Sequence, residues 1–499
     1  MKKITVVWSL YLTLALTLIA GCGGDSSSSQ PAPLSADKTN LIFVVSPDLA
    51  YNTPGDIQPD TANLTSQGLN RSLMLATYLK QQVLGGKNVN SIYTISPMSH
   101  LQTANNYPDM AAIGFIQQFA LLNQITLHVD GNGSTYTGNN YPVNVSYARR
   151  EGVPNGVPTP PAYCTNCSGL DFNNTAEIND TLVAGIIDSK TPGFYVFSAP
   201  WETVRAMLLK INTRYGYNLN LPTAYTGSNY VYAVSLPTTS GKADLVTYNS
   251  NLTPPPTYPV LPSPVPSAAC TNRYQPYFST VLTGGVNGVS IPAGVNTNST
   301  VYIVRHAEAH PDPGFGFDDG NYVAAGQWRA LSLATTLRGK INPGLVYSID
   351  PAGLWYPNRD LHVSYVRPAL TVLPYAIANN LPYYLAASIS FGTSTDPTDP
   401  TIANNTSAFF FTGGRFSNQT VLVAWESGHI RPFINALIKS YGSNLPLLDT
   451  TGPPTGGWPS EDYDTIWTVI FDAQGNLTVH NALCEGIDSS KLPATAPLF

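Results

Sequence analysis

The chain has 499 residues, which is too long for one ordinary hydrophobic core and predicts two domains of roughly 200 residues each. Lys and Arg number 24 against 30 Asp and Glu, and the basic residues form no run that would neutralise a nucleic-acid backbone, so nucleic acid is excluded as an expected partner. Only 11% of the residues are charged while 43% are hydrophobic, which, with 42 Pro and 40 Gly, favours an exported protein with compact cores and long uncharged loops.

The first residues have the order of a secretion signal. Two lysines precede the apolar run "ITVVWSLYLTLALTLIA", and "GCGG" follows it. The segment "LIAGC" resembles the lipobox of bacterial lipoproteins, which implies a signal peptide within residues 1–22 and a lipid on Cys22. Gly23 after this cysteine favours the outer membrane of a bacterial cell envelope. A transmembrane anchor is the alternative, because about 17 apolar residues approach the length of a membrane span.

Residues 23–39 predict a flexible tether, and "NLIFVVSPD" predicts the first strand. Short apolar runs then alternate with helical patterns, which is typical of βαβ units and a mainly parallel sheet. Residues 251–297 begin with the Pro-rich stretch "NLTPPPTYPVLPSPVPS" and predict an extended linker. The linker separates a predicted domain of residues 40–250 from one of residues 298–499.

Four blocks recur in the same order on both sides of this linker. The segments "GLNRSLMLATYL" and "GQWRALSLATTL" share seven of twelve positions without a gap. The other pairs are "LIFVVSPD" with "VYIVRHAE", "IYTISP" with "VYSIDP", and "FYVFSAPWETVRAMLLKI" with "VLVAWESGHIRPFINALI". Two unrelated α/β domains with generic patterns are the alternative. The ordered recurrence favours two tandem three-layer α/β/α domains, each with a mainly parallel central sheet.

Arg305 and His306 stand at the end of the apolar strand "VYIVRHAE". Carboxyl ends of parallel strands are where open α/β sheets place their sites, although an isolated Arg-His pair can also simply end a strand in solvent. "VRPALT" then places Arg367 four residues before Thr371. With this order of blocks, the second half resembles the histidine phosphatase superfamily, which contains phosphoglycerate mutases and acid phosphatases.

The resemblance implies a chemistry for these residues. His306 would attack a phosphoryl group and form a phosphohistidine, which water then hydrolyses. Arg305 and Arg367 would hold the phosphate oxygens, because guanidinium groups are planar and permanently charged donors. The implied substrate is a small phosphorylated molecule, and no metal or organic cofactor is needed.

The second histidine of this family has two candidates here. An ungapped alignment of "VLVAWESGHIR" on the family's strand-His-Gly-x-x-Ile-Arg pattern places Glu426 at the histidine. A shift of three residues, through a longer turn between strand and helix, would bring His429 into the site instead, and we favour this interpretation. A carboxylate from Glu426 would repel phosphate unless it were protonated.

No proton donor is fixed by the pattern. The candidate acids are Glu308, Asp318, Asp319 and Glu426, and a loop acid near a strand end is more often simply solvated. His310 and His362 are expected at the surface. No carboxylate cluster accompanies the histidines in the sequence, so no metal site is expected.

The first half differs at all the corresponding positions. Val45 and Ser46 replace the Arg-His pair, Ser99 or His100 stands where the second arginine is expected, and Thr203 takes the place of the second histidine. This half should therefore not bind phosphate in the same way. A structural partner, a lid over the other site and a binding module for something else are the alternatives.

Apart from Cys22, the chain has Cys164, Cys167, Cys270 and Cys484, an even number in an oxidising compartment. Disulfides are expected, and their connectivity stays open. Zinc at "CTNC" is a less favoured alternative, because no second such pair and no nearby histidine accompany it.

Two hypotheses of function follow. The first is a lipid-anchored envelope phosphatase, a phosphoric monoester hydrolase active in its second half. The second is a non-catalytic surface or binding lipoprotein, in which the many Tyr and Asn side chains of both degenerate domains contact glycans or a protein partner. Neither the substrate nor the oligomeric state is predicted, because fold does not imply substrate.

Overall fold

The computed structural model describes residues 30–123, 125–128, 135–138, 143–145, 169–239, 241–271, 274–309, 320–352, 354–355, 363–386, 400–451 and 457–499. Several residues considered above lie outside these ranges: Cys22, Cys164, Cys167, His310, Asp318, Asp319 and His362. Within these ranges, none of the helices combines the length and the apolar character that crossing a membrane requires.

The first half contains a six-stranded sheet in the order β10–β9–β1–β8–β2–β7. Its strands are β1 (Lys38–Val45), β2 (Ser91–Thr94), β7 (Val143–Val145), β8 (Gly193–Ala199), β9 (Tyr230–Pro237) and β10 (Asp244–Asn249). Strands β1, β8, β2 and β7 are parallel, β9 is antiparallel to β1, and β10 is antiparallel to β9. The apolar run of β1 is buried on both faces, as expected for a central strand that helices cover on both sides.

The second half contains a seven-stranded sheet in the order β11–β19–β18–β12–β17–β13–β16. Its strands are β11 (Ser279–Leu282), β12 (Ser299–Arg305), β13 (Leu345–Ile349), β16 (Tyr383–Ala386), β17 (Thr420–Trp425), β18 (Thr465–Phe471) and β19 (Leu477–Cys484). Apart from the added edge strand β11, the order and the strand directions are those of the first sheet. The two halves therefore share one sheet topology, in which β12 takes the position of β1.

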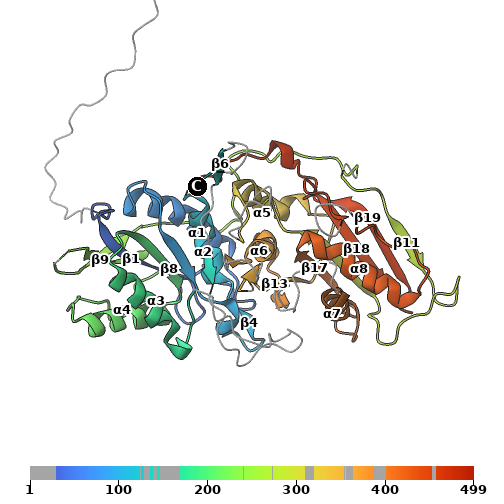
Figure 1. Cartoon of the computed structure of the whole chain (residues 1–499), viewed down its shortest axis with the longest axis horizontal. Helices are drawn as coiled ribbons and strands as arrows, with labels where there is room; N and C mark the ends of the chain where they lie inside the picture. Colours follow the sequence, from blue (N-terminus) through green and yellow to red (C-terminus); the bar gives the residue numbers. More distant parts are fainter. Residues whose placement is uncertain are drawn as a thin grey trace, which may run out of the picture.

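Eight helices of the described residues cover the faces of the sheets. They are α1 (Ser66–Tyr78), α2 (Ala111–Leu121), α3 (Ile178–Ser189), α4 (Trp201–Tyr215), α5 (Ala324–Thr336), α6 (Arg367–Asn379), α7 (Pro400–Phe411) and α8 (Ser427–Tyr441). Figure 1 shows α1, α2, α5 and α6 between the two sheets, with α3 and α4 outside the first sheet and α7 and α8 outside the second. The chain is a mixed α/β protein with helices on both faces of each sheet.

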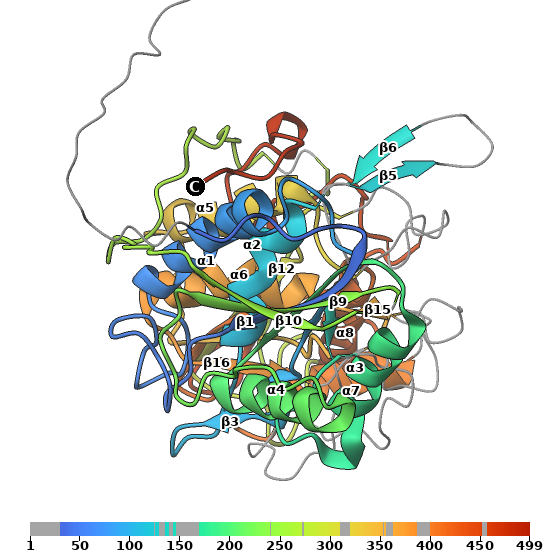
Figure 2. The ribbon, with the colours of Figure 1, turned by 90° about the vertical axis from the view of Figure 1, so that its left-hand side faces the viewer.

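The described residues also form short strands. They are β3 (Leu101–Gln102), β4 (Tyr107–Pro108), β5 (Ile125–His128), β6 (Thr135–Gly138), β14 (Leu354–Trp355) and β15 (Val363–Ser364). Figure 2 shows the hairpin of β5 and β6 extending away from the rest of the molecule. The other two pairs, β3 with β4 and β14 with β15, are two-stranded antiparallel ribbons.

The alternation of side chains along β1 explains how the layers form. Ile42 and Val44 pack into the central core between the sheets, while Leu41, Phe43 and Val45 pack against the outer helices α3 and α4. Successive side chains of a strand point to opposite faces, so an uninterrupted apolar run supplies both layers at once. The same division holds for β12, whose residues enter the central core and the core under α7 and α8.

The central core is continuous between the two halves. One cluster of buried apolar side chains takes members from α1 and α2 as well as from α5 and α6. Polar side chains also pair across it: Gln117 and Asn321 exchange two hydrogen bonds of 2.8 and 3.1 Å, and Gln327 donates to Gln118 at 2.8 Å. The halves are therefore joined through a shared interior and not only through the chain that connects them.

Described parts of the predicted tether and linker contact the rest of the chain. Leu34 is buried in the central core and its N–H donates to the carbonyl of Val83, so the later part of the tether is packed. In the linker, the hydroxyl of Tyr258 donates to the Leu331 carbonyl at 2.9 Å, and β11 joins the second sheet. The prolines keep the backbone extended, as expected, but its apolar side chains lie along the central helices.

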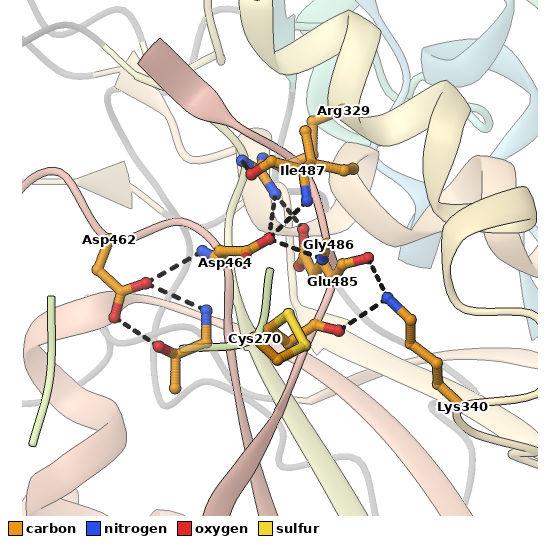
Figure 3. The surroundings of a disulfide bond; sticks show 10 residues. Cys270, Arg329, Lys340, Asp462, Asp464, Glu485, Gly486 and Ile487 are labelled. Carbon is orange, nitrogen blue, oxygen red and sulfur yellow. Dashed lines mark hydrogen bonds and ion pairs between the residues drawn. A yellow bond between two sulfur atoms is a disulfide. The ribbon is translucent and has the colours of Figure 1, made fainter. Parts of the chain in front are cut away.

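One disulfide fixes this segment. Cys270 of the linker is bonded to Cys484, the last residue of β19, with a Cα–Cα distance of 5.3 Å (Figure 3). The sequence left the disulfide connectivity open, and the structure contains the bond between Cys270 and Cys484.

The C-terminal residues contact helices of both halves, and Figure 1 marks the end of the chain beside α1. Gln118 of α2 donates to the carbonyl of Pro497, and the indole N–H of Trp328 in α5 donates to the carbonyl of Thr495 at 2.8 Å. The end of the chain thus bridges a helix of the first half and a helix of the second.

Candidate active site

The candidate residues of the second half gather at the carboxyl ends of two parallel strands. Arg305 is the last residue of β12 and His306 follows it, while Glu426 follows β17, the parallel neighbour of β12. The backbone N–H of His306 donates to the carbonyl of Trp425 at 3.0 Å, which holds the two strand ends together. Arg367 begins α6, which packs against β13 and β17.

His306 is held as a neutral imidazole. Its side chain is buried, and Nδ1 lies 2.8 Å from the carbonyl oxygen of Ala307, so Nδ1 carries the proton and donates it there. Burial lowers the pKa of His306 well below its usual value, and the charges of Arg367 and Arg305 lower it further. Nε2 forms no hydrogen bond with a described residue and keeps its lone pair. Thr371 fixes this loop by accepting from the N–H of Ala307 at 2.8 Å.

Most of the hydrogen bonds that Arg305 can donate go to other residues of the protein. Nη1 donates to the carbonyls of Pro459, Ser460 and Asp462 at 2.8 to 3.2 Å, and Nη2 donates to the hydroxyl of Tyr463 at 3.3 Å. The guanidinium carbon also lies 3.9 Å from the centre of the Tyr463 ring. Only Nε is buried without a hydrogen-bond partner among the described residues. Arg305 therefore supplies a fixed positive charge beside His306, while most of its hydrogen-bonding capacity is used within the protein.

Arg367 is the second arginine near His306, and both arginines are close enough to lower the pKa of His306. The guanidinium carbon of Arg367 is 4.7 Å from the ring centre of Tyr365. The rings of Tyr365 and Tyr463 meet the imidazole of His306 edge-on, at 6.2 and 6.1 Å between ring centres. Two aromatic rings thus flank the imidazole and orient both guanidinium groups.

Glu426 occupies the end of β17 and caps α8. Its Oε2 accepts from the backbone N–H of His429 at 3.0 Å and lies 2.7 Å from Nδ1 of the same histidine, while Oε1 accepts from the hydroxyl of Ser427 at 3.0 Å. Burial alone would raise the pKa of Glu426, but the hydrogen bond and charge of His429, with a backbone hydrogen bond at Gly428, outweigh it and hold this pKa below its usual range. Glu426 is therefore an ionised carboxylate close to His306.

The longer turn predicted before α8 is not formed. The helix begins at Ser427, directly after Glu426, so the backbone follows the ungapped alignment, in which Glu426 takes the position that the resemblance implies for a histidine. His429 lies in the first turn of α8 and is bonded to Glu426. Its Nε2 is buried and has no hydrogen-bond partner among the described residues. The structure thus brings Arg305, His306 and Glu426 together and attaches His429 to them through the carboxylate.

Glu308 belongs to a different cluster, which Figure 3 shows in part. Its two carboxylate oxygens accept from Nε of Arg329 in α5 at 2.8 and 3.0 Å. Arg329 is fully buried and also pairs with Glu485 and, at 3.7 Å, with Asp464, while Ser489 accepts at 2.7 Å. Both oxygens of Glu308 are thus engaged in this ion cluster, and the geometry does not support its candidate role as a proton donor.

The first half contains the counterpart of this arginine. Arg71 of α1 donates from Nε to Asp56 at 2.7 Å, and from Nη1 to the side chain of Asn229 and the carbonyl of Leu252. Asn229 directly precedes β9 as Asp464 precedes β18, so both helices send a buried arginine to the same place in their sheet. The sequence repeat contained this arginine, but nothing in the sequence indicated its distant partners.

In the first half, most of the residues at the corresponding positions have structural roles. Val45 and Ser46 are buried. The hydroxyls of Ser99 and Thr203 donate to backbone carbonyls at 2.8 and 3.2 Å. Among these positions, only that of His100 carries an ionisable side chain.

His100 is part of a charged cluster that the sequence analysis did not find. Its Nε2 lies 2.6 Å from Oδ2 of Asp48, and one possible ligand atom from each of Asp48, His100 and Asp109 lies within 4.8 Å of the others. These residues are separated by many positions in the chain, so spacing rules for metal ligands could not have connected them. The available signal was that Asp48 follows β1 closely and that His100 and Asp109 follow β2.

Comparisons with known proteins find no matching family model and no matching curated protein. Solved structures similar to this chain include a protein of Agrobacterium tumefaciens assigned as the phosphohistidine phosphatase SixA (16% identity, 34% of this chain and 90% of that chain, TM-score 0.21). Others are the product of the open reading frame Rv3214 of Mycobacterium tuberculosis (16%, 38% and 99%, TM-score 0.23) and a phosphoserine phosphatase mutant of Entamoeba histolytica (13%, 39% and 98%, TM-score 0.18). At these TM-scores, the function of this chain has to be argued from its own residues.

Proposed function

We propose that this protein is a histidine-type phosphatase that hydrolyses a small phosphomonoester in its second half and is held at the bacterial cell envelope by a lipid on Cys22. The observation that carries the catalytic part is the state of His306. Its Nδ1 carries the proton and donates it to the Ala307 carbonyl, so Nε2 keeps an unshared lone pair in a residue that two nearby arginines help to hold neutral. The lipid anchor rests on the lipobox-like "LIAGC" alone.

The proposed reaction has two steps. Nε2 of His306 attacks phosphorus, so a P–N bond forms while the bond from phosphorus to the alcohol oxygen breaks, and the alcohol leaves after taking up a proton. A water molecule then attacks phosphorus and loses a proton, the P–N bond breaks, and inorganic phosphate leaves His306 as it was. Arg305 and Arg367 stabilise the charge on the phosphoryl oxygens in both steps.

Glu426 is the observation that favours the alternative function. Its ionised carboxylate lies close to His306, where it opposes the approach of a phosphate dianion. If this repulsion prevails, the site around His306 would favour a ligand with less negative charge than a phosphate dianion. The protein would then be a non-catalytic binding lipoprotein built from the two halves. Glu426 also has a place in the enzymatic reaction, since a carboxylate beside His306 can accept the proton of the attacking water.

The test compares the full chain, purified in detergent, with its His306→Ala variant, using 4-nitrophenyl phosphate as substrate. We expect hydrolysis by the wild type and its loss in the variant. A matched control is His480→Ala, which removes a half-buried histidine of β19 outside the site. Rapid denaturation of the reacting enzyme without acid should trap the intermediate, which is an acid-labile phosphate on His306. Equal rates in the wild type and His306→Ala would refute the enzymatic proposal and leave the binding function.

A further inference from the structure

The charged cluster of the first half lies at the position that corresponds to the phosphate site of the second. Asp48 follows β1, His100 and Asp109 follow β2, and Glu202 follows β8 in the first turn of α4. Strands β1, β8 and β2 are parallel neighbours, so their carboxyl ends meet at one edge of the sheet. The four side chains therefore converge from three strand ends that are far apart in sequence.

The geometry brings three of them within reach of one ion. Ligand atoms of Asp48, His100 and Asp109 lie within 4.8 Å of one another. Ligand atoms on a common metal ion, each about 2.1 Å from it, are separated by roughly 3 to 4 Å, so a small inward movement suffices. His100 is already oriented, because it is stacked on Phe172 at 3.6 Å between ring centres and bonded to Asp48.

Asp109 gives a second and independent reason to expect a ligand here. It is fully buried, and its Oδ1 accepts from the backbone N–H of Ala111 at 2.9 Å, while Oδ2 has no hydrogen-bond partner among the described residues. A buried carboxylate oxygen without a partner is costly, and such groups usually have a functional explanation. Burial, with the nearby Asp48 carboxylate, raises the pKa of Asp109 to about 7, although His100 acts in the opposite direction.

The charge of this cluster is opposite to that of the other site. None of the hydrogen bonds or ion pairs that Asp48, His100 and Asp109 make with described residues involves a lysine or an arginine. Glu202 adds a further carboxylate close enough to interact with Asp48 and His100. The second half instead has two arginines around a neutral imidazole. At the same edge of the shared sheet topology, the second half thus carries positive charge and the first half carries an excess of negative charge.

We propose that Asp48, His100 and Asp109 form a binding site for one divalent transition-metal ion, with Glu202 available as a fourth ligand. An imidazole nitrogen together with carboxylate oxygens is a donor set that suits Zn²⁺ and Mn²⁺. Zn²⁺ should bind more tightly than Mn²⁺, following the general order of affinities. Mg²⁺ and Ca²⁺ should bind weakly, because they prefer sites made only of oxygen ligands.

Binding exchanges protons for the metal ion. The proton shared between His100 and Asp48 leaves for solvent, and both atoms turn to the ion. Asp109 contributes Oδ2 without giving up its hydrogen bond to Ala111. The ion thereby supplies the positive charge that the described surroundings of this cluster lack. This site is independent of whether the second half hydrolyses phosphate.

The test measures binding of Zn²⁺ and Mn²⁺ to the full chain by isothermal titration calorimetry after treatment with a chelator, with the thermal midpoint as a second measurement. We expect one equivalent of Zn²⁺ and a rise of the thermal midpoint on binding. Asp109→Asn and His100→Gln should each weaken Zn²⁺ binding by at least about tenfold. Asp109→Asn should fold well without metal, because it removes a buried charge.

Two control variants should keep wild-type affinity. Asp244→Asn removes an exposed carboxylate of β10, and His306→Ala alters only the site of the second half. Full Zn²⁺ affinity in both Asp109→Asn and His100→Gln would overturn the proposal. Loss of binding in His306→Ala but not in His100→Gln would place the metal in the other half and overturn it equally.

Discussion

At the scale of single residues, Glu426 decides the character of the second-half site. It takes the position after β17 that the resemblance reserved for a histidine, it is ionised, and it binds His429 instead of leaving that histidine to face the site alone. Its carboxylate offsets part of the positive charge that the two arginines present to a phosphate dianion. The affinity for phosphate should therefore respond strongly to this one side chain.

Replacing Glu426 by glutamine keeps an oxygen that can cap α8 but removes the charge. We expect Glu426→Gln to bind inorganic phosphate about tenfold more tightly, which corresponds to roughly 1.4 kcal/mol, because one nearby repulsive charge is lost. Calorimetric titration with phosphate at low ionic strength measures the change. Glu202→Gln in the other half is the matched control and should leave the affinity as it is. Weaker binding in Glu426→Gln would mean that the carboxylate helps to hold the ligand.

The lowered pKa of the buried His306 predicts how the stability of the protein depends on pH. Its pKa in the folded protein is lowered, so below the unfolded value of about 6.5 the unfolded chain takes up a proton that the folded chain does not. Its contribution to stability is therefore complete above that pH and is lost as the pH falls towards the folded pKa. The free energy of unfolding in urea should drop more between pH 7.5 and pH 5.5 for the wild type than for His306→Gln. Equal drops in the two proteins would contradict this.

At the scale of secondary-structure elements, the buried arginines of α1 and α5 connect each helix to the strand ends of its sheet. Among the described residues, Arg329 forms ion pairs with three carboxylates, whereas Arg71 forms one, with Asp56. Burial raises the pKa of Glu485 to about 8 even with Arg329 beside it. The arginine of α5 should therefore contribute more to stability than that of α1.

Arg329→Leu leaves buried carboxylates without their counter-charge and should cost roughly 3 to 5 kcal/mol of unfolding free energy. Arg338→Leu removes an exposed arginine just after the same helix and should cost less than about 0.5 kcal/mol. Urea unfolding of both variants at pH 7.5 provides the comparison. A similar small effect in both would show that the carboxylates of the cluster are neutral at this pH.

The elements show which features the sequence could predict. Apolar runs and the gapless helix repeat predicted the alternating elements, and the Arg-His strand end was correctly placed at the carboxyl edge of a parallel sheet. The partners of Arg329 and the cluster around His100 were not predictable, because their residues come from strand ends that only the completed sheet brings together. For α8, the ungapped alignment described the local backbone better than the inserted turn, because Glu426 is itself a suitable N-cap.

At the scale of the whole molecule, the halves share the core formed by α1, α2, α5 and α6. Separating them would expose this apolar surface and leave the side chains of Gln117, Gln118 and Asn321 without their partners. Residues 1–250 and 251–499, produced separately, should therefore lack a cooperative unfolding transition in calorimetry. Produced together, they should assemble and recover one. A cooperative transition in either half alone would contradict this view of a shared core.

The bridging position of the C-terminal residues has a consequence for how the chain folds. The contact of Gln118 with Pro497 spans 379 positions, and that of Asn63 with Leu381 spans 318, so the central core closes only through contacts between distant parts of the chain. Contacts of such separation slow folding, because a large loss of chain entropy precedes them. During synthesis, the inner helices of the first half are fully covered only after the last residues of the chain have been made. Chains released early would expose apolar helices, and we expect them to be the natural targets of chaperones and proteases.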